Sequence, residues 1–170
     1  QHAEVLTKAE QWKEWLRLHR DALADLPSVD EAQRDALLRR IDEVGDKLDR
    51  QAFQVLARDI TAAFTITDAS SSAATHSVHS VSNLALITSG HNSALSNAVF
   101  EVKRRRIIEL DRRGGYIPIC TRQVFLKYYT DADGLQIHFW STQDRDAYLS
   151  AILSTNGGVG AYLNPEAPAP

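Results

Sequence analysis

The sequence predicts a mainly α fold, a helical bundle with a small β contribution. Apolar residues recur at helical spacing in three stretches before residue 65 and again after about residue 96. Only one short apolar run, residues 82–87, has the character of a buried strand. With 170 residues and 44% hydrophobic content, the chain is long enough to bury one sizeable core. We therefore expect a single domain over residues 1–163.

A first helix is predicted to follow a capping box at Thr7-Lys8-Ala9-Glu10 and to end near Leu23. Its apolar side chains recur at i, i+3, i+4 and i+7, so they share one face that we expect to be buried. This face comprises Trp12, Trp15, Leu16 and His19. We interpret the two Trp side chains as core residues rather than as platforms on which nucleic-acid bases stack.

Two further helices are predicted before residue 65. Pro27 ends the first helix, and a second capping box at Ser28-Val29-Asp30-Glu31 starts the next one. The charged face of this second helix is interpreted as solvated surface, opposite a buried stripe of Ala32, Leu37, Leu38, Ile41, Val44 and Leu48. The third helix, about residues 51–64, is anchored by Phe53, Val55, Leu56, Ile60, Ala63 and Phe64.

The central part of the chain changes from strand-like to helical periodicity. Residues 82–87 are predicted to form a short buried strand, and residues 88–92 a turn in which Gly90 is free to adopt a positive φ. A helix is then expected from about Ser96, with apolar residues on one face and Lys103, Arg104, Arg105 and Arg106 largely on the other. A strand, a polar turn and a basic helix together form a scaffold that can hold a cation beside a phosphate.

Residues 67–80 are small and polar and are predicted to form a loop. His76 and His79 within it have the spacing H-x-x-H, but their Ser/Thr-rich surroundings and the distant single Cys argue against a zinc site. The simplest interpretation of His79 is a hydrogen-bonded structural histidine at the entrance to the strand.

The last third of the chain is predicted to be short helices and extended pieces. Gly114-Gly115 ends the basic helix, an extended piece covers residues 116–119, and Thr121 caps a helix that carries Val124, Phe125, Tyr128 and Tyr129. Asp131-Ala132-Asp133-Gly134 lacks the further ligands of a calcium loop and is interpreted as a turn. After an extended piece at residues 135–140, Thr142 is expected to cap a final helix that ends near Leu153, and residues 164–170 to form a disordered tail.

Charge and cysteine content limit the possible partners and compartment. Residues 98–130 carry eight Lys/Arg and three Asp/Glu, a local net charge of +5, although the whole chain has a net charge of −3. A local phosphate-binding face is therefore possible. The single Cys120 cannot form an internal disulfide, and no apolar run approaches the roughly 20 residues that span a bilayer. These facts favour a cytoplasmic protein that does not bind a membrane.

The central stretch resembles a known family. Residues 82–87 (SNLALI), 92–97 (NSALSN) and 100–104 (FEVKR) together are similar to the second half of an HNH nuclease motif. More narrowly, they resemble the HNH domain at the C-terminal end of the GmrSD-type, modification-dependent restriction endonucleases. The similarity extends over most of residues 1–155, including Glu10 to Leu16, Gly115 to Thr121, Val124 to Tyr129 and Trp140 to Tyr148.

The resemblance implies a fold, an activity and roles for particular residues. The helical bundle would surround a partial ββα-metal element that hydrolyses phosphodiester bonds of double-stranded DNA with Mg²⁺ or Mn²⁺, in restriction-modification or anti-phage defence. Asn92 would be the metal ligand. Asn83 and His79 would be the catalytic residues of this chain, with Asn83 orienting the catalytic His of the first strand. Phosphate contacts would come from Asn97, Lys103, Arg104 and Arg106.

One departure from the family pattern affects the expected activity. The family's first strand carries an acidic residue followed by a His that acts as general base, and no Asp-His or Glu-His dipeptide occurs in this chain. We therefore expect residues 1–163 to be the C-terminal fragment of a longer protein, inactive alone. An upstream regulatory domain of the parent protein, or a complementing fragment, would be its partner.

Simpler interpretations of the same residues stay open. Asn83 is suited to satisfying turn backbone, Asn92 and Asn97 to capping helices, and the run from Lys103 to Arg106 to a solvated helix face. A second hypothesis is accordingly a non-catalytic helical module that binds DNA or a partner through residues 103–113. A third is a protein-interaction domain without nucleic-acid contact. The motifs of P-loop NTPases, dinucleotide-binding proteins and serine hydrolases are absent from the sequence.

Overall fold

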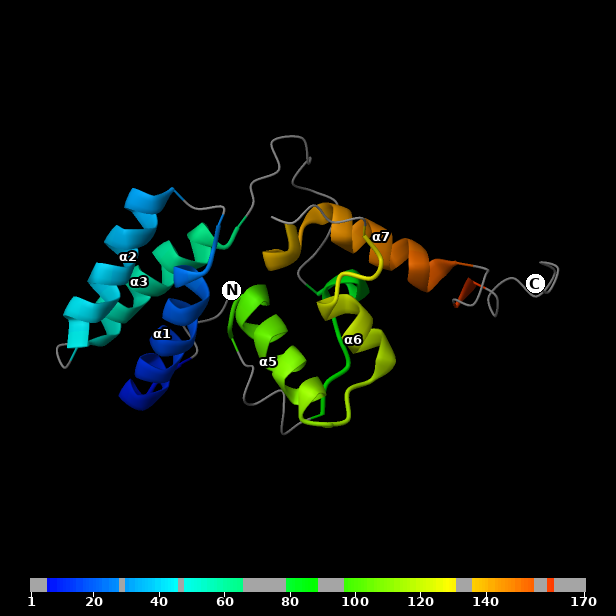
Figure 1. The fold of residues 1–170 in the computed structure, drawn as a ribbon, viewed down its shortest axis with the longest axis horizontal. Helices are drawn as coiled ribbons and strands as arrows, with labels where there is room; N and C mark the ends of the chain where they lie inside the picture. Colours follow the sequence, from blue (N-terminus) through cyan, green and yellow to red (C-terminus); the bar gives the residue numbers. More distant parts are fainter. Residues whose placement is uncertain are drawn as a thin grey trace. The chain divides into compact units, whose positions relative to one another are not determined.

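The computed structural model describes residues 6–27, 30–45, 48–65, 79–88, 97–130, 136–154 and 159–160. These residues contain six α-helices and two 3₁₀ turns, and no strand, which confirms the mainly α prediction for the described part of the chain (Figure 1). The chain divides into two compact units that interleave in sequence. Unit 1 contains Gln1–Ile66 and Thr88–Gly115, and unit 2 contains Thr67–Ile87 and Tyr116–Pro170. The expected single domain over residues 1–163 stays a prediction.

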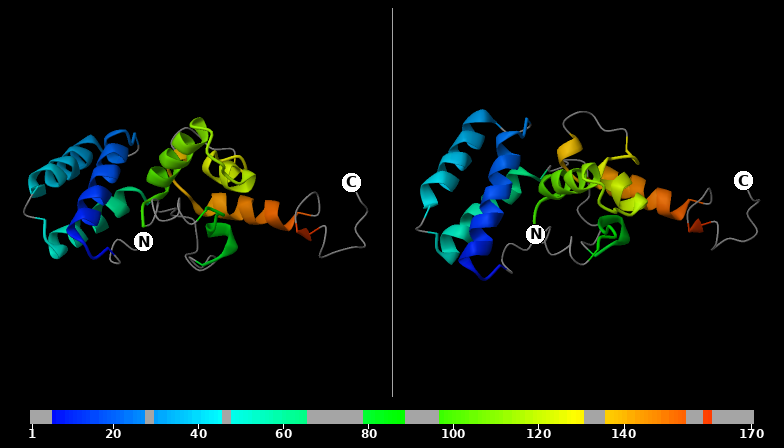
Figure 2. Two further views of the ribbon diagram at one scale, coloured as in Figure 1. Left: turned by 90° about the horizontal axis from the view of Figure 1, so that it is seen from below. Right: turned by 60° about the horizontal axis from the view of Figure 1, so that its bottom comes forward.

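The described residues of unit 1 form four helices: α1 (Ala9–Ala24), α2 (Glu31–Val44), α3 (Arg50–Ala63) and α5 (Phe100–Arg112). α1 packs against the other three, and α2 also packs against α3 (Figures 1 and 2). The stripe predicted for α1 is buried as expected, and α3 contributes Phe53, Leu56, Ile60 and the following Phe64 to the same core. Trp12 stacks on Phe53, and Trp15 meets the edge of the same ring, with ring centroids 5.6 Å apart in both pairs.

The helix starts in unit 1 differ from the predicted capping boxes. α1 begins at Ala9, and the Gln11 amide oxygen accepts hydrogen bonds from the Thr7 and Lys8 N–H groups at 3.3 and 3.2 Å. Asp30 caps α2 by accepting from the backbone of Ala32 and Gln33. A single carboxylate oxygen, Oδ1, accepts both hydrogen bonds, so Asp30 takes the capping role predicted for Ser28, which lies outside the described residues.

Unit 2 contains α6 (Ile119–Phe125), α7 (Thr142–Leu153) and the 3₁₀ turns η3 (Val81–Asn83) and η4 (Gln136–His138). η3 packs against α7. The predicted buried strand at residues 82–87 is wrong, because its first two residues lie in η3, the residues after them are not a strand, and Leu84 and Leu86 are exposed. The extended piece predicted at residues 135–140 is likewise interrupted by η4. Ser141 rather than Thr142 caps α7, and α6 begins before Thr121 and ends before Tyr128.

Residues 84–88 continue from η3 without regular secondary structure. Unit 2 binds residues 82–87 through side chains instead of a neighbouring strand. The Thr121 hydroxyl donates to the Leu86 carbonyl at 2.5 Å, and the Trp140 indole N–H donates to the Ser82 carbonyl at 3.2 Å. Apolar periodicity alone predicts a strand here, but a strand forms only where another strand supplies backbone partners.

No helix in the described part of the chain is both long and apolar enough to cross a lipid bilayer. The predicted turn at residues 131–134, the zinc spacing at His76 and the tail at residues 164–170 lie outside the described residues.

Candidate functional site

The start of α5 is fixed by two aromatic side chains of α1. The Trp15 indole N–H donates to the Asn97 carbonyl at 3.0 Å, and the Val99 N–H donates to Nε2 of His19 at 3.1 Å. Asn97 has a φ of +64°, a left-handed conformation that Asn adopts more readily than most L-residues. The basic helix therefore starts from a fixed backbone position.

His19 is neutral and has one defined tautomer. Its Nδ1 lies 2.7 Å from the Trp15 carbonyl, which can only accept a hydrogen bond, so Nδ1 carries the proton. Its Nε2 is then the acceptor that the Val99 N–H requires. The imidazole is fully buried and stacks on the Trp15 ring with centroids 3.5 Å apart. Burial penalises the imidazolium and lowers the pKa of His19 to about 4.

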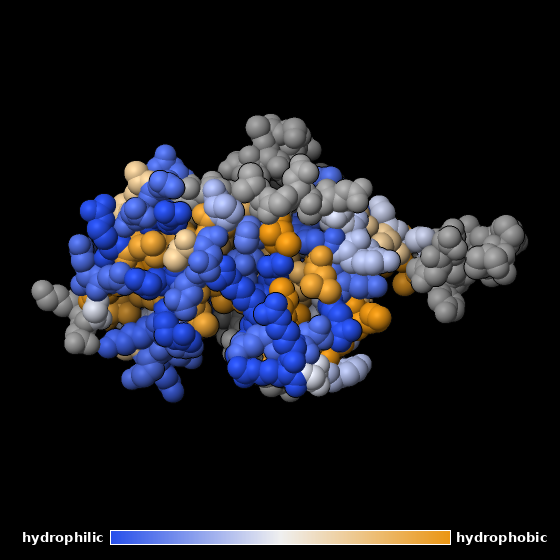
Figure 3. Space-filling view, in the orientation of Figure 1, coloured by the Kyte–Doolittle hydropathy of each residue, from blue (hydrophilic) through white to orange (hydrophobic). Residues whose placement is uncertain are grey.

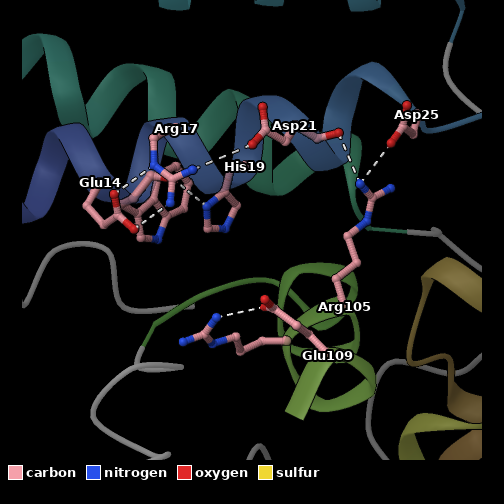
Figure 4. Close-up of polar contacts among 9 residues, drawn as sticks. Glu14, Arg17, His19, Asp21, Asp25, Arg105 and Glu109 are labelled. Carbon is pink, nitrogen blue, oxygen red and sulfur yellow. Dashed lines mark hydrogen bonds and ion pairs between the residues drawn. The ribbon is translucent and has the colours of Figure 1, made fainter. Parts of the chain in front are cut away.

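Two arginines of the basic run face a buried carboxylate. Glu101 is only 1% exposed; its Oε1 accepts from Nε of Arg105 at 2.8 Å, and its Oε2 lies 3.5 Å from Arg104. The Arg105 guanidinium also donates to the Asp25 carboxylate at 2.9 Å and to the Asp21 carbonyl at 3.2 Å (Figure 4). A buried carboxylate is stable only when it is paired. Arg105 therefore neutralises Glu101 and connects α5 to the C-terminal end of α1.

The remaining cations of α5 differ in exposure. Arg106 donates to Glu109 at 2.7 Å, and Arg113, just after the helix, donates to the same carboxylate at 2.5 Å. The Arg106 and Arg113 side chains are 46% and 71% exposed. Lys103 is half-buried, and burial lowers the pKa of its ammonium group. Of the three cations predicted to contact phosphate, Arg106 alone is exposed, since the Arg104 side chain is only 16% exposed.

The other predicted site residues are placed in separate parts of the structure. His79 is exposed in the turn before η3, and Asn83 is half-buried at the end of η3, both in unit 2. Asn97 and the cations of α5 belong to unit 1. Asn92 lies outside the described residues. The roles proposed for His79, Asn83 and Asn92 therefore stay predictions.

The residues that the structure describes do not supply a metal site by themselves. They contain no group of three or more His, Cys, Asp or Glu side chains arranged to hold a metal ion. Glu101, the acidic residue of the motif region, faces two guanidinium groups. A metal ion at this motif would depend on Asn92 and on ligands outside the described residues.

Sequence reasoning missed a buried ion pair in unit 2. Lys127 donates through Nζ to Oδ2 of Asp144, and the two side chains are 2% and 0% exposed. Asp144 also accepts from the Thr130 hydroxyl at 2.6 Å, and from the Ser141 N–H and hydroxyl at 2.7 and 2.9 Å. The ammonium group lies 5.2 Å from the centroid of the Trp140 ring. Through these contacts Asp144 joins Lys127, Thr130 and the start of α7 within unit 2.

Lys127 occupies a backbone position that usually belongs to glycine. It follows the last residues of α6 with a φ of +59°, and the N–H groups of Lys127 and Tyr128 return to Val124 and Gln123 in a Schellman motif. A left-handed conformation costs an L-residue about 1–2 kcal/mol. The two backbone hydrogen bonds of this motif and the ion pair with Asp144 accompany this conformation. The Ser141-x-x-Asp144 spacing marks a capping box, but no pattern in the sequence pairs it with Lys127.

Comparisons of this chain with known protein families, with curated proteins and with solved structures find no match. The site must therefore be interpreted from its own residues.

Proposed function

We propose that this chain is the C-terminal part of an HNH-type endonuclease that cuts double-stranded DNA with Mg²⁺ or Mn²⁺ in a restriction or anti-phage defence protein. The observation that carries the proposal is the order of chemical features along one stretch. Asn83 precedes an apolar segment, Asn92 and Asn97 follow at short intervals, and the basic helix α5 begins at Phe100. Capping or turn formation explains each Asn singly, but neither requires a basic continuation.

In this proposal each residue has a defined task. Asn92 supplies an amide oxygen to the metal ion, and Asn83 fixes the orientation and tautomer of a catalytic His on an upstream strand, with His79 beside it. Asn97 and the exposed Arg106 contact phosphate, and Lys103 and Arg104 contribute positive potential from more buried positions. When bound, the metal ion would stabilise the charge that develops on the phosphate. The fixed start of α5 supports this arrangement, since Trp15 and His19 hold the backbone between Asn97 and Val99.

Plasmid cleavage with Mg²⁺ tests the proposal. We expect little or no cutting by this chain, and cutting by a version extended upstream through the first catalytic strand. In the extended version, Asn92→Ala should abolish cleavage and leave the circular dichroism spectrum and melting temperature unchanged. Asn164→Ala is the matched control and should retain full activity. Full cleavage by the Asn92→Ala variant would refute the assignment.

A non-catalytic DNA-binding module is the second candidate. The observation that favours it is the exposure of Arg106, Arg112 and Arg113 toward the C-terminal end of α5. If these residues contact phosphates, DNA affinity should fall steeply with salt concentration. In a plot of the logarithm of affinity against the logarithm of salt concentration, each lost contact should reduce the steepness of the slope by about 1. We expect Arg113→Gln to do so, whereas Arg58→Gln, an exposed arginine on α3, should leave the slope unchanged. Salt-dependent binding without cleavage by the extended chain would favour this candidate.

A further inference from the structure

Residues 84–88 form an extended segment with one face open to solvent. Leu84 has φ and ψ of −114° and 143°, which is β-region backbone. Exposure then alternates along the segment, since Leu84 and Leu86 are 55% and 70% exposed whereas Ala85 and Ile87 are half-buried. Alternation with a period of two is the signature of a strand with one buried face. The exposed face carries two leucines.

One edge of this segment is bound within unit 2, and the other is open. The Leu86 carbonyl accepts the hydrogen bond from Thr121 of α6, so the backbone of Leu86 faces α6 (Figure 1). In an extended chain, successive residues direct their N–H and C=O groups to opposite edges. The backbone groups of Ala85 and Ile87 therefore point away from α6, and neither residue makes a hydrogen bond to another described residue. An unpaired edge of this kind is a template for pairing with another strand.

The composition of the segment indicates what can pair with it. Residues 80–88 (SVSNLALIT) contain no charged residue, no Gly and no Pro. Pairing with a second copy of the same segment therefore brings no like charges together, and nothing in the segment selects a charged partner by attraction. Natural edge strands commonly prevent self-association with a charge or a proline, and this edge has neither.

The segment is also self-complementary in antiparallel register. With Leu86 on the twofold axis, Ala85 of one copy lies opposite Ile87 of the other. Each of these two pairs exchanges two N–H···O bonds, which gives four in all. The two Leu86 side chains meet on the exposed face as a non-hydrogen-bonded pair, the arrangement in which opposing side chains lie closest. Such an interface is the same patch on both copies, as a closed dimer requires.

We propose that this chain forms a twofold dimer in which residues 84–88 of two copies pair as antiparallel strands. The exposed leucines and the open backbone edge are the two halves of one interaction surface, and its partner is a second copy of the chain. Ile119 at the start of α6 and Leu126 directly after it are also exposed, and they add to the apolar surface of the same unit. Figure 3 shows hydrophobic surface in the region of α6.

Sedimentation velocity of the chain from about 10 µM to about 1 mM tests the dimer. Leu86→Lys places two ammonium groups opposite each other on the axis. Ala85→Pro removes one backbone N–H from each copy, and with it two of the four hydrogen bonds between the strands. The proline suits this position because the preceding Leu84 already has β-region backbone. Each substitution should weaken dimerisation at least about tenfold. Leu153→Lys, the matched control at a 54% exposed leucine of α7, should leave it unchanged.

A second measurement on the unmodified chain covers the case in which a variant does not fold. The Ala85 and Ile87 amides should exchange hydrogen more slowly as protein concentration rises, because pairing protects them. A chain that stays monomeric over the whole series, or amides whose exchange is independent of concentration, would overturn the proposal. A dimer that neither substitution weakens, or a monomer that pairs only with an added apolar peptide, would overturn it as well.

Discussion

Acidification should destabilise unit 1 through His19. The pKa of this residue is about 4 in the folded state, against 6.5 when it is exposed. Between these values the unfolded chain binds a proton that the folded chain excludes. The contribution of His19 to stability is therefore fully present above pH 6.5, falls as the pH decreases, and is lost below about pH 4. At about 1.36 kcal/mol per pKa unit, the loss amounts to about 3 kcal/mol.

The structural reason for this pH dependence is that Nε2 of His19 faces the Val99 N–H. Protonation would add a hydrogen to Nε2 of His19. Two donors, this N–H and the Val99 N–H, would then face each other without an acceptor. His19→Gln is the informative variant, because a side-chain amide oxygen accepts from the Val99 N–H and does not titrate. The variant loses the stacking on Trp15, so its stability at pH 7 should be lower, but its stability should depend less on pH between 6.5 and 4.

Urea unfolding at half-unit pH intervals measures this difference. Carboxylates that titrate at low pH contribute equally to both proteins, so the comparison isolates His19. Gln54→Ala, at an exposed residue of α3 that does not titrate, is the control and should show the same dependence on pH as the unmodified chain. An NMR titration of the His19 ring should give a midpoint near 4. Parallel stability curves for the unmodified chain and His19→Gln, or a midpoint near 6.5, would refute the reasoning.

Two further predictions concern the ion pairs. Lys127→Met leaves Asp144 buried without its counter-charge and should destabilise unit 2 by about 3 kcal/mol in urea unfolding; a loss below about 1 kcal/mol would contradict a buried pair. Arg105→Ala removes the closer of the two arginines that face the buried Glu101 and should cost about 2 kcal/mol. Arg106→Ala removes an exposed pair and should leave the melting temperature nearly unchanged; equal effects of the two arginine substitutions would show that Arg105 has no structural role.

The sequence by itself determined the helices of unit 1. Their apolar spacing depends only on the 3.6-residue period, so the buried face of α1, including His19, is predictable without knowledge of its neighbours. The ends of the helices are less predictable, because several polar residues near each start compete for the same N–H groups. Gln11 and Asp30 replace the predicted Thr7 and Ser28 in this way.

Only the tertiary structure decided what the charged and polar residues do. The run from Lys103 to Arg106 looks uniformly basic, yet Arg104 and Arg105 face the buried Glu101 while Arg106 is exposed. Asp25, directly after α1, also pairs with Arg105. The sequence does not indicate the Lys127–Asp144 pair, which joins residues 17 positions apart through a left-handed backbone conformation. Whether residues 84–88 form a strand likewise depends on a partner strand from elsewhere. A helix satisfies its hydrogen bonds locally, whereas ion pairs and strands depend on partners that only folding brings together.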